Sequence, residues 1–477
     1  MIQRRPDLEP AFYPRSIAIV GASNQPGKPG HDYLEALLDL GFRGALYPVT
    51  PKEDYVLGLR AFPNVCAIPD PVDYVISCIP APLVPSLMED CVAKGVKIAH
   101  LYTAAFSETG EQERALLEAE TLRIAQAGGV RIIGPNCMGI YCPESGLSFR
   151  YGQPKKSGPV ALISQSGGYA STITFMSRAR GLRFSKVVSY GNAVDLNECD
   201  FLEYCANDRQ TRVIAAYIEG PRNGHRFLQL VREVSLQKPV VILKGGWTSA
   251  GSRAVASHTG SLAGQREIWE SFFKQSGAIP VNSLEELVDV VLAFVHLGAP
   301  RGRRAGVVGG GGGGSVSAAD DCERVGLPVP PMPPQIMAEL HRLLPDAGIS
   351  IGNPVDTSVV SRNRSAMPDV VRLVAGSEEV DLLVIDTGVD WMVGYRNGRD
   401  MLRLNVGMLI YTAGLFREKP AVFSLRSASI PHEWRDLLDE LRDQILDAGF
   451  PVYENTARAA NAISKLVQYY EWRAARV

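Results

Sequence analysis

The chain has 477 residues, which is enough for about three domains that each bury a core of their own. Its 49 basic and 51 acidic side chains nearly balance, so no large electrostatic field draws it to nucleic acid or to an anionic membrane. The eight cysteines form no Cys-x-x-Cys pair, and no apolar run is long enough to span a bilayer. We expect a cytoplasmic protein with reduced, mostly buried cysteines.

From Ser16 onward, short apolar runs alternate with longer amphipathic ones, a pattern typical of parallel βαβ units. This pattern predicts one doubly wound α/β domain over residues 1–142. A polar stretch from Pro143 to Gly158 is interpreted as a linker, because it carries Pro, Gly, Ser and lysines without periodicity. The predicted strands of this domain are Ser16–Val20, Ala45–Val49, Asp73–Ile79, Lys97–Leu101 and Arg131–Ile133.

Two further α/β domains are predicted over residues 157–299 and 303–477. The glycine run Gly309–Gly314 is interpreted as a flexible connection between a strand and a helix that begins at Ser315. The strands predicted for the two domains are Pro159–Ser164, Lys186–Ser189, Val213–Ile218, Pro239–Leu243, Gly306–Val308, Asp381–Asp386 and Pro420–Ser424. Their other predicted helices are Tyr169–Ala179, Ser283–Val295 and Thr456–Ala475.

A glycine turn, Gly21–Gly30, follows the first predicted strand and precedes a helix, so backbone N–H groups and a helix N-terminus face any ligand there. The spacing is not Gly-x-Gly-x-x-Gly, and the second strand ends in Thr50-Pro51-Lys52 where a dinucleotide enzyme usually has an acid. Lys52 favours a phosphorylated ribose, although Glu53 and Asp54 weaken this charge argument. An ordinary strand-to-helix turn is the alternative.

Two more segments should lie along the same carboxyl edge of the sheet, where open α/β folds bind ligands. One is Ile79-Pro80-Ala81-Pro82, after the third strand, and the other is the loop Gly134–Gly139. Cys137, within that loop, is interpreted as a packing residue.

A histidine stands among small residues in the octet Ser257–Gly264. The small neighbours of His258 leave room for a phosphate on its ring, and a neutral imidazole nitrogen is a competent phosphoryl acceptor. This pattern is compatible with a mobile catalytic loop and equally with a structural turn.

Two other segments could complete a phosphohistidine site. Ser164–Gly168 turns from a strand into a helix, which directs N–H groups and the positive end of a helix dipole at an anion. Glu219 ends the strand Val213–Ile218, where a carboxylate can accept a hydrogen bond from one imidazole nitrogen and leave the other free. Each feature alone is also explained by an ordinary turn or a solvated cap.

Taken together, these motifs resemble the α subunit of the ADP-forming acetyl-CoA synthetases, in the superfamily of succinyl-CoA synthetase. The resemblance covers most of the chain in order, and the histidine octet carries the most weight. The matching segments are Ser16–Gly30, Tyr47–Lys52, Ile79–Ala81, Gly134–Gly139, Ser164–Gly168, Ser189–Asn192, Tyr217–Gly220, Ser257–Gly264 and Asn353–Asp356.

The resemblance implies a Rossmann-like CoA-binding domain followed by two flavodoxin-like α/β domains, the last of which contacts a partner. It implies that His258 is phosphorylated, that Glu219 orients it, and that Ser166, Gly167 and Gly168 hold its phosphate. The implied CoA-binding residues are Gly21, Ala22, Ser23, Gly27, Lys28, Lys52, Pro80, Ala81 and Asn136. No residue is assigned to a metal.

The activity implied is that of a nucleoside-diphosphate-forming acyl-CoA synthetase, which joins a carboxylic acid to CoA. No stretch resembles an ATP-grasp module, so ATP/ADP or GTP/GDP and Mg²⁺ should bind an ATP-grasp β subunit in a hetero-oligomer. One departure is Ala105-Phe106-Ser107-Glu108-Thr109-Gly110, where the family often has glycine before the phenylalanine. This departure could alter the acyl pocket.

Two other functions stay open on the sequence. The first is a CoA-responsive regulatory or binding protein that kept the fold without turnover, since fold does not fix function. The second is an NAD(P)-dependent dehydrogenase, against which the glycine spacing and the end of the second strand both argue.

Overall fold

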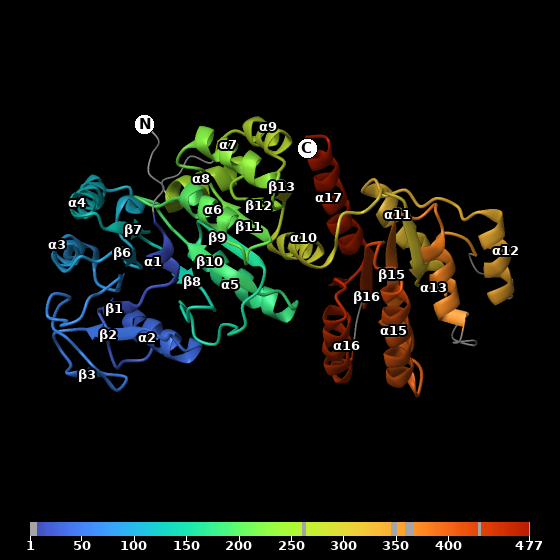
Figure 1. Ribbon diagram of the computed structural model, residues 1–477, viewed down its shortest axis with the longest axis horizontal. Coiled ribbons are helices and arrows are strands. Elements are labelled where there is room, and N and C mark those ends of the chain that lie inside the picture. The colour runs from blue at the N-terminus through green and yellow to red at the C-terminus, as the bar shows by residue number, and fades with distance from the viewer. Residues whose placement is uncertain (1–6, 260–263, 345–350, 358–365, 428–430, 477) are drawn as a thin grey trace. The chain divides into compact units, whose positions relative to one another are not determined.

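The computed structural model describes residues 7–259, 264–344, 351–357, 366–427 and 431–476, without the side chains of residues 256–259. The chain divides into two compact units, Met1–Leu287 and Val288–Val477. Unit 1 contains two largely parallel sheets and unit 2 contains one (Figure 1). The α/β fold class predicted from the sequence is thereby confirmed. Within the described segments, no helix combines the length and the apolarity needed to cross a membrane.

The first sheet has the strand order β2-β1-β5-β6-β7 and is parallel throughout. Helices α3 and α4 cover one face, and their apolar residues pack on side chains such as Val75 and Ala99. The strands are β1 (Ser16–Val20), β2 (Ala45–Val49), β5 (Tyr74–Ser77), β6 (Ile98–Leu101) and β7 (Arg131–Ile133). The helices and small elements are α1 (Glu9–Phe12), α2 (Pro29–Leu40), β3 (Tyr55–Val56), β4 (Leu59–Arg60), η1 (Ala81–Leu83), α3 (Val84–Lys94), η2 (Ser107–Thr109) and α4 (Gln112–Gly128).

The second sheet has the order β13-β12-β11-β9-β10-β8. Its edge strand β8 (Gly139–Tyr141) is antiparallel to β10 and was not predicted from the sequence. The remaining strands are β9 (Val160–Ser164), β10 (Phe184–Ser189), β11 (Val213–Ile218), β12 (Val240–Lys244) and β13 (Ile279–Val281). The helices are α5 (Gly167–Ala179), α6 (Glu198–Asn207), α7 (Gly224–Ser235), α8 (Ser249–Thr259), α9 (Arg266–Ser276) and α10 (Leu284–His296).

Both sheets of unit 1 contain a point where the strand order reverses. In the first sheet β2 and β5 flank β1 on opposite sides, and in the second β10 and β11 flank β9. The crevice at the carboxyl ends of two such strands is where open α/β sheets bind ligands. The glycine turn after β1 and the glycine turn after β9 therefore each lie at a position suited to a ligand.

The stretch between the two sheets is packed against the protein. Residues 143–158 form no helix or regular strand, but Leu147 and Phe149 are buried and Cys142 pairs with Leu147 in an isolated bridge. Two of its polar residues are buried as well, and the Ser148 hydroxyl donates to the side-chain oxygen of Gln153 over 2.7 Å.

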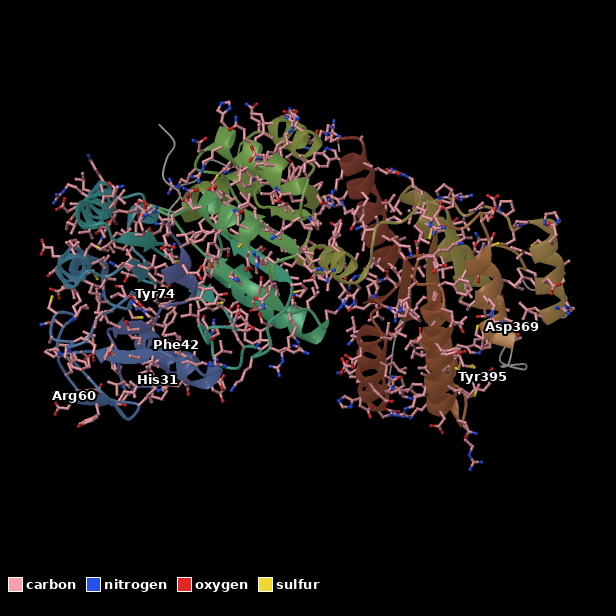
Figure 2. All side chains as sticks on the ribbon, in the orientation of Figure 1. His31, Phe42, Arg60, Tyr74, Asp369 and Tyr395 are labelled. Atoms are coloured by element: carbon pink, nitrogen blue, oxygen red, sulfur yellow. The ribbon has the colours of Figure 1, made fainter. Side chains whose placement is uncertain are left out.

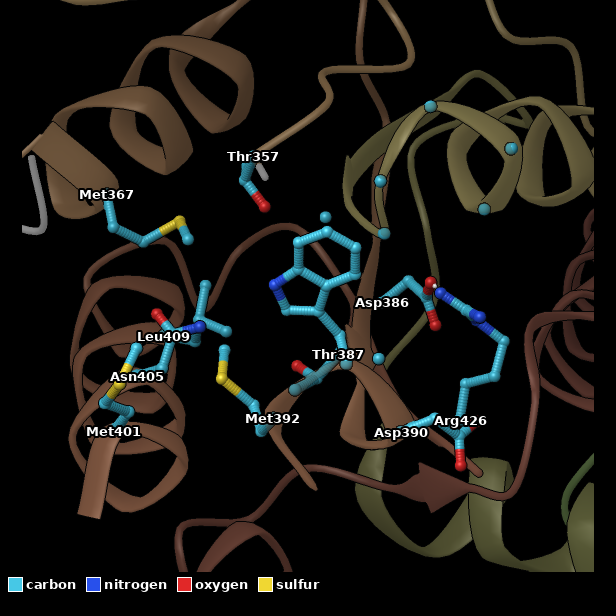
Figure 3. Close-up of a pocket in the computed structure, with 18 residues that line it drawn as sticks. Thr357, Met367, Asp386, Thr387, Asp390, Met392, Met401, Asn405, Leu409 and Arg426 are labelled. Carbon is cyan, nitrogen blue, oxygen red and sulfur yellow. Dashed lines mark hydrogen bonds and ion pairs between the residues drawn. The ribbon is translucent and has the colours of Figure 1, made fainter. Parts of the chain in front are cut away.

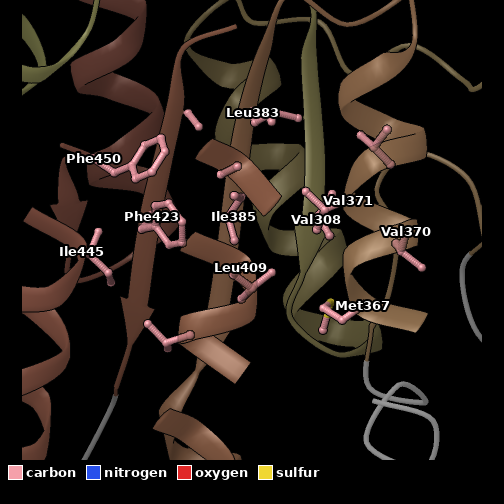
Figure 4. Close-up of a cluster of buried hydrophobic side chains, with 14 of the residues drawn as sticks. Val308, Met367, Val370, Val371, Leu383, Ile385, Leu409, Phe423, Ile445 and Phe450 are labelled. Atoms are coloured by element: carbon pink, nitrogen blue, oxygen red, sulfur yellow. The ribbon is translucent and has the colours of Figure 1, made fainter. Parts of the chain in front are cut away.

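Unit 2 is built on the parallel sheet β14-β15-β16-β17. Figure 4 shows the cluster on one face, where Met367, Val370 and Leu409 from the helices pack on sheet residues such as Ile385 and Phe423. The strands are β14 (Ala305–Gly309), β15 (Leu382–Gly388), β16 (Ala421–Arg426) and β17 (Val452–Tyr453). The helices are α11 (Gly312–Arg324), α12 (Pro334–Leu343), α13 (Met367–Gly376), α14 (Val389–Val393), α15 (Gly398–Gly414), η5 (His432–Trp434), α16 (Arg435–Asp447) and α17 (Thr456–Ala474).

Candidate functional site

The glycine turn after β1 is shaped by two close approaches of the backbone. Gly21 has φ +91°, and a Cβ atom there would lie 2.8 Å from the carbonyl oxygen of Cys78. A Cβ atom on Gly30 would lie 2.1 Å from the carbonyl oxygen of Gly21. Helix α2 therefore begins in contact with the end of β1, at the carboxyl edge of the first sheet.

The other predicted cradle residues lie around this turn. Ser23 accepts a hydrogen bond from the N–H of Gln25 over 3.1 Å, Gly27 has φ +84°, and Lys28 is the exposed N-cap of α2. Ala22 is buried, and Lys52 is exposed just beyond β2.

Asn24 was not predicted as a site residue, yet it ties the turn to the chain after β2. Its amide donates to the carboxylate of Glu53 and to the carbonyl oxygen of Tyr55, and its Oδ1 accepts from the N–H of Leu57 over 2.9 Å. The carboxylate of Glu53, whose negative charge next to Lys52 disfavours a phosphorylated ribose, is thus hydrogen-bonded to Asn24.

A cavity of about 530 Å³ opens between the carboxyl ends of the two sheets of unit 1. It brings together Pro80 and Asn136 from the first sheet with Ser166, Gly167 and Gly168 from the second. The other lining residues are Pro29, Cys78, Ile79, Tyr102, Thr103, Ala104, Cys137, Met138, Gln165 and Gly191. Among the described residues, the predicted positions outside this lining are Gly21, Ala22, Ser23, Gly27, Lys28, Lys52, Ala81 and Glu219.

Helix α5 begins two residues earlier than the sequence pattern predicted. Ser166 is its N-cap, and the Ser166 hydroxyl accepts a hydrogen bond from the N–H of Tyr169 over 3.3 Å. Gly167 and Gly168 form the start of the first turn, where helix N–H groups have no acceptor within the helix. Since both glycines line the cavity, their N–H groups and the helix dipole favour an anion there.

Glu219 is buried directly after β11 and is held through its side chain and its backbone. The Tyr217 hydroxyl donates to its carboxylate over 3.1 Å. The side-chain oxygen of Gln165 accepts hydrogen bonds from the N–H groups of Glu219, over 2.9 Å, and of Gly220, over 3.3 Å. Gln165 therefore links the carboxylate-bearing loop to the turn that contains Ser166.

The backbone of His258 lies in the last turn of α8, rather than in a loop or tight turn. Val255, one turn earlier, is buried and fixes this helix against the protein. The side chain of His258 and residues 260–263 lie outside the described residues.

The cavity cysteines are unsuited to act as thiolates. Burial raises the pKa of both Cys78 and Cys137 well above the usual range. Cys137 is buried with its thiol 3.8 Å from the carbonyl oxygen of Leu101, as expected for a packing residue.

The loop Ala105–Gly110 begins with a residue in a conformation that favours glycine. Ala105 has φ +70°, a left-handed conformation that favours glycine. Glu108 accepts hydrogen bonds from the N–H groups of Ala105, over 2.7 Å, and Phe106, over 3.1 Å, and from the Asn192 amide. The 3-10 turn η2 in this loop contacts α8, the helix of His258, and none of the loop residues lines the cavity.

Unit 2 contains a second cavity, of about 560 Å³, at the N-terminus of α11 (Figure 3). All six residues of the run Gly309–Gly314 line it, and Gly312–Gly314 form the first turn of the helix. The run connects a strand to a helix as predicted, but the helix begins at Gly312 rather than Ser315, because the last three glycines adopt helical conformation. Arg426 forms an ion pair over 3.2 Å with Asp386. Burial raises the pKa of the Asp386 carboxyl group, and the positive charge of Arg426 acts in the opposite direction.

Three residues at the start of α2 could act together as cation ligands. His31, labelled in Figure 2, is buried, and its ring lies 3.4 Å from the carboxylate of the exposed Asp32. Ligand atoms of His31, Asp32 and Glu35 lie within 4.8 Å of one another. Because the two carboxylates are exposed, this grouping by itself does not define a metal site.

Comparison with known proteins gives two family matches. Residues 15–143 match a CoA binding domain, and residues 157–294 match a succinyl-CoA ligase like flavodoxin domain. The chain is 34% identical to the α subunit of ADP-forming acetate–CoA ligase II of Pyrococcus furiosus, over 97% of both chains.

Two further relatives support the same placement. ADP-forming acetate–CoA ligase I of Archaeoglobus fulgidus is 37% identical over 79% of this chain and 54% of its own length. The solved structure of acetyl-coenzyme A synthetase 1 from Ca. Korarchaeum cryptofilum, in complex with phosphate and ADP, is 32% identical. It covers 98% of both chains with a TM-score of 0.83.

Proposed function

The chain belongs to the family of ADP-forming acetyl-CoA synthetase α subunits, and we propose that it is the CoA-binding, phosphohistidine-carrying subunit of a nucleoside-diphosphate-forming acyl-CoA synthetase. In that role it interconverts acid, CoA and nucleoside triphosphate with acyl-CoA, nucleoside diphosphate and phosphate.

The first proposed step takes place in the cavity of unit 1. A phosphate oxygen attacks the thioester carbon, the C–S bond breaks, CoA leaves as the thiolate, and acyl phosphate forms. Pro80, Asn136 and the turn Gly21–Lys28 with Lys52 hold CoA, with Ala81 just beyond. The N–H groups of Gly167 and Gly168, beside Ser166, hold the phosphate.

In the second step, an imidazole nitrogen of His258 attacks phosphorus, the bond between phosphorus and the carboxyl oxygen breaks, and the carboxylate leaves. Glu219 stabilises the ring by accepting a hydrogen bond from its other nitrogen. The phosphohistidine then transfers the group at a nucleotide site elsewhere, where the nucleoside diphosphate accepts it.

We propose that this nucleotide site belongs to an ATP-grasp β subunit that binds ATP/ADP or GTP/GDP with Mg²⁺. The Pyrococcus furiosus relative is itself an α subunit, which supports a partner. The greater length of the Archaeoglobus relative, of which 54% is covered, supports an additional module fused to the corresponding chain. The division into domains 1–142, 157–299 and 303–477, with the last at the partner interface, is part of the same proposal.

The observation that carries the proposal is the cavity that joins the two sheets of unit 1. Its lining combines the carboxyl edge of a sheet that matches a CoA binding domain with the N-terminus of α5. A CoA-responsive protein without turnover would need the first of these features only.

The test is labelling of the full chain by radioactive phosphate in the presence of acetyl-, propionyl- or phenylacetyl-CoA. We expect acid-labile label on the wild type and none on His258→Asn, with CoA binding unchanged in the variant. Glu219→Gln should label more slowly, because the amide still accepts a hydrogen bond but lacks the negative charge. His225→Asn, at an exposed histidine on α7, is the matched control. Undiminished label on His258→Asn would show that another residue is the carrier.

A further inference from the structure

A buried lysine lies next to Glu219 at the end of the neighbouring strand. Lys244 is the last residue of β12, and it pairs in register with Ile218, the residue before Glu219. The N–H of Gly245 continues this ladder by donating to the carbonyl oxygen of Ile218 over 2.9 Å. Since paired strands lie about 4.8 Å apart, the chain segments of Lys244 and Glu219 are immediate neighbours.

The environment of Lys244 is unusual for a cation. The side chain is 3% exposed, its ammonium group donates to the carbonyl oxygen of Gly245, and it lies 5.1 Å from the centre of the Trp269 ring. Burying a charge is unfavourable unless other groups compensate for the lost water. The Trp269 ring and the negative charge of Glu219 provide such compensation.

Lys244 is connected to both ends of the histidine octet. The chain leaves Lys244 through a short turn and enters α8 at Ser249, and α8 includes the backbone of His258. At the other end of the octet, Gly264 lies against Trp269, since a Cβ atom on Gly264 would be 3.2 Å from the indole nitrogen. The indole that contacts the Lys244 ammonium group therefore also contacts the residue that closes the octet.

The turn that follows Lys244 is closely packed against Tyr217 and Glu219. A Cβ atom on Gly245 would lie 2.5 Å from the Tyr217 hydroxyl and 3.3 Å from the Glu219 side chain. The turn after Lys244 thus packs directly on the hydroxyl that donates to Glu219.

We propose that Lys244 is a positioning residue of the phosphohistidine relay. Its ammonium group supplies a positive charge next to the Glu219 segment and packs on Trp269, which lies against the end of the octet. This inference rests on the proposed function, because it assigns Lys244 to the site of His258 and Glu219. It adds a positive charge that balances Glu219 while a phosphoryl group, also negative, arrives on the histidine.

The pH dependence of labelling distinguishes this role from simple packing. Burial lowers the pKa of Lys244 to about 8, and attraction to Glu219 acts in the opposite direction. Among the described residues around the ammonium group, Glu219 is the charged neighbour that acts on it. The Trp269 ring is neutral, and burial raises the pKa of the Tyr217 phenol and so keeps it neutral. As the pH rises through this pKa the cation is lost, so the labelling rate should fall.

The experiment compares the rate of histidine labelling, by radioactive phosphate with the acyl-CoA that labels the wild type, across a range of pH. We expect Lys244→Met to label about tenfold more slowly or worse, without the alkaline decline. Lys244→Arg should keep the label and move the decline to higher pH, because a guanidinium group stays protonated.

Lys238→Met is the matched control at the other end of the same strand. Lys238 lies two residues before the start of β12 and donates to the carbonyl oxygens of Cys205, over 3.1 Å, and Asp208, over 2.7 Å. Its loss should lower thermal stability and leave the labelling rate and its pH profile unchanged.

Each other result overturns the inference. Wild-type rates and an unchanged pH profile in Lys244→Met would show that Lys244 has no part in the relay. Equal loss of labelling in Lys244→Met and Lys238→Met, in proportion to stability, would show a structural role only. If Lys244→Met does not fold, a wild-type pH profile in Lys244→Arg has the same meaning. An unlabelled wild type would instead refute the proposed function itself.

Discussion

The side-chain oxygen of Gln165 accepts a hydrogen bond from the backbone N–H of Glu219 over 2.9 Å. The two residues are far apart in sequence but follow paired strands, since Ser164 is in register with Tyr217. This contact fixes the carboxylate-bearing loop relative to the N-terminus of α5. The side chain of Gln165 thus helps to set the distance between the Glu219 loop and the N-terminus of α5.

Gln165→Leu should lower both stability and labelling. The leucine leaves the buried N–H groups of Glu219 and Gly220 without this acceptor, at a cost of about 1–3 kcal/mol in the free energy of unfolding. Urea unfolding and phosphate labelling measure the two effects. Gln126→Leu, at an exposed position on α4, should change neither. Labelling at the wild-type rate in Gln165→Leu would show that the loop is held by other contacts.

Ala105→Gly should stabilise the protein. At φ +70° an alanine is strained by about 1–2 kcal/mol relative to glycine, and the greater freedom of glycine in the unfolded chain offsets about 0.4–1 kcal/mol of this. The net gain, roughly 1 kcal/mol, is measurable by urea unfolding. Ala104→Gly is the control, because Ala104 is not among the positive-φ residues and should lose stability. A loss in both variants would contradict the assigned backbone conformation.

The strands of this protein could be predicted well because they are buried on both faces. Ser16–Val20, Arg131–Ile133 and Val213–Ile218 were predicted with the observed bounds, as expected for continuous apolar runs. Helix α8 and the first turn of α11 were not, because Ser, Gly and Ala there give no apolar period and the glycines suggest a loop.

Contacts between residues that are far apart in the sequence could not be predicted from one sequence. Gln165 lies in the predicted turn Ser164–Gly168, but its role depends on the order of β9 and β11 in the sheet, which puts Ser164 beside Tyr217. Lys244 lies one residue beyond the predicted strand Pro239–Leu243, and only the register with Ile218 places it next to Glu219. Asn24 is likewise explained by the return of the chain at Glu53–Leu57.

Gly30→Ala should weaken CoA binding by the full chain. The added methyl group would meet the Gly21 carbonyl oxygen at 2.1 Å, so α2 must move away from the turn that it faces. We expect at least a tenfold rise in the dissociation constant by calorimetry, equivalent to about 1.4 kcal/mol. Gly41→Ala, at the other end of α2, has no atom within 4 Å of the new methyl group and should bind CoA normally. Equal affinity in both variants would place CoA elsewhere.

The chain alone should carry out half of the reaction. The CoA edge of the first sheet and the anion-binding start of α5 line the same cavity, and both belong to unit 1. Acyl-CoA and labelled phosphate should therefore yield free CoA and acid-labile label without any partner. The amount should stop at about one phosphate per chain, because the phosphohistidine has no acceptor. Thiol titration and acid-labile counts, taken from the same sample, measure the two products.

Adding nucleoside diphosphate should give different results with the chain alone and with the complete enzyme. With the diphosphate alone the label should stay on the protein, because the proposed relay needs an ATP-grasp partner to bring the acceptor to the phosphohistidine. With the partner it should pass to nucleoside triphosphate, and free CoA should then accumulate over many turnovers. His258→Asn controls both stages, since it should release no label with the partner present. Nucleoside triphosphate formed by the chain alone at an ordinary enzymatic rate would show that one polypeptide holds both sites and that the split-subunit proposal is wrong.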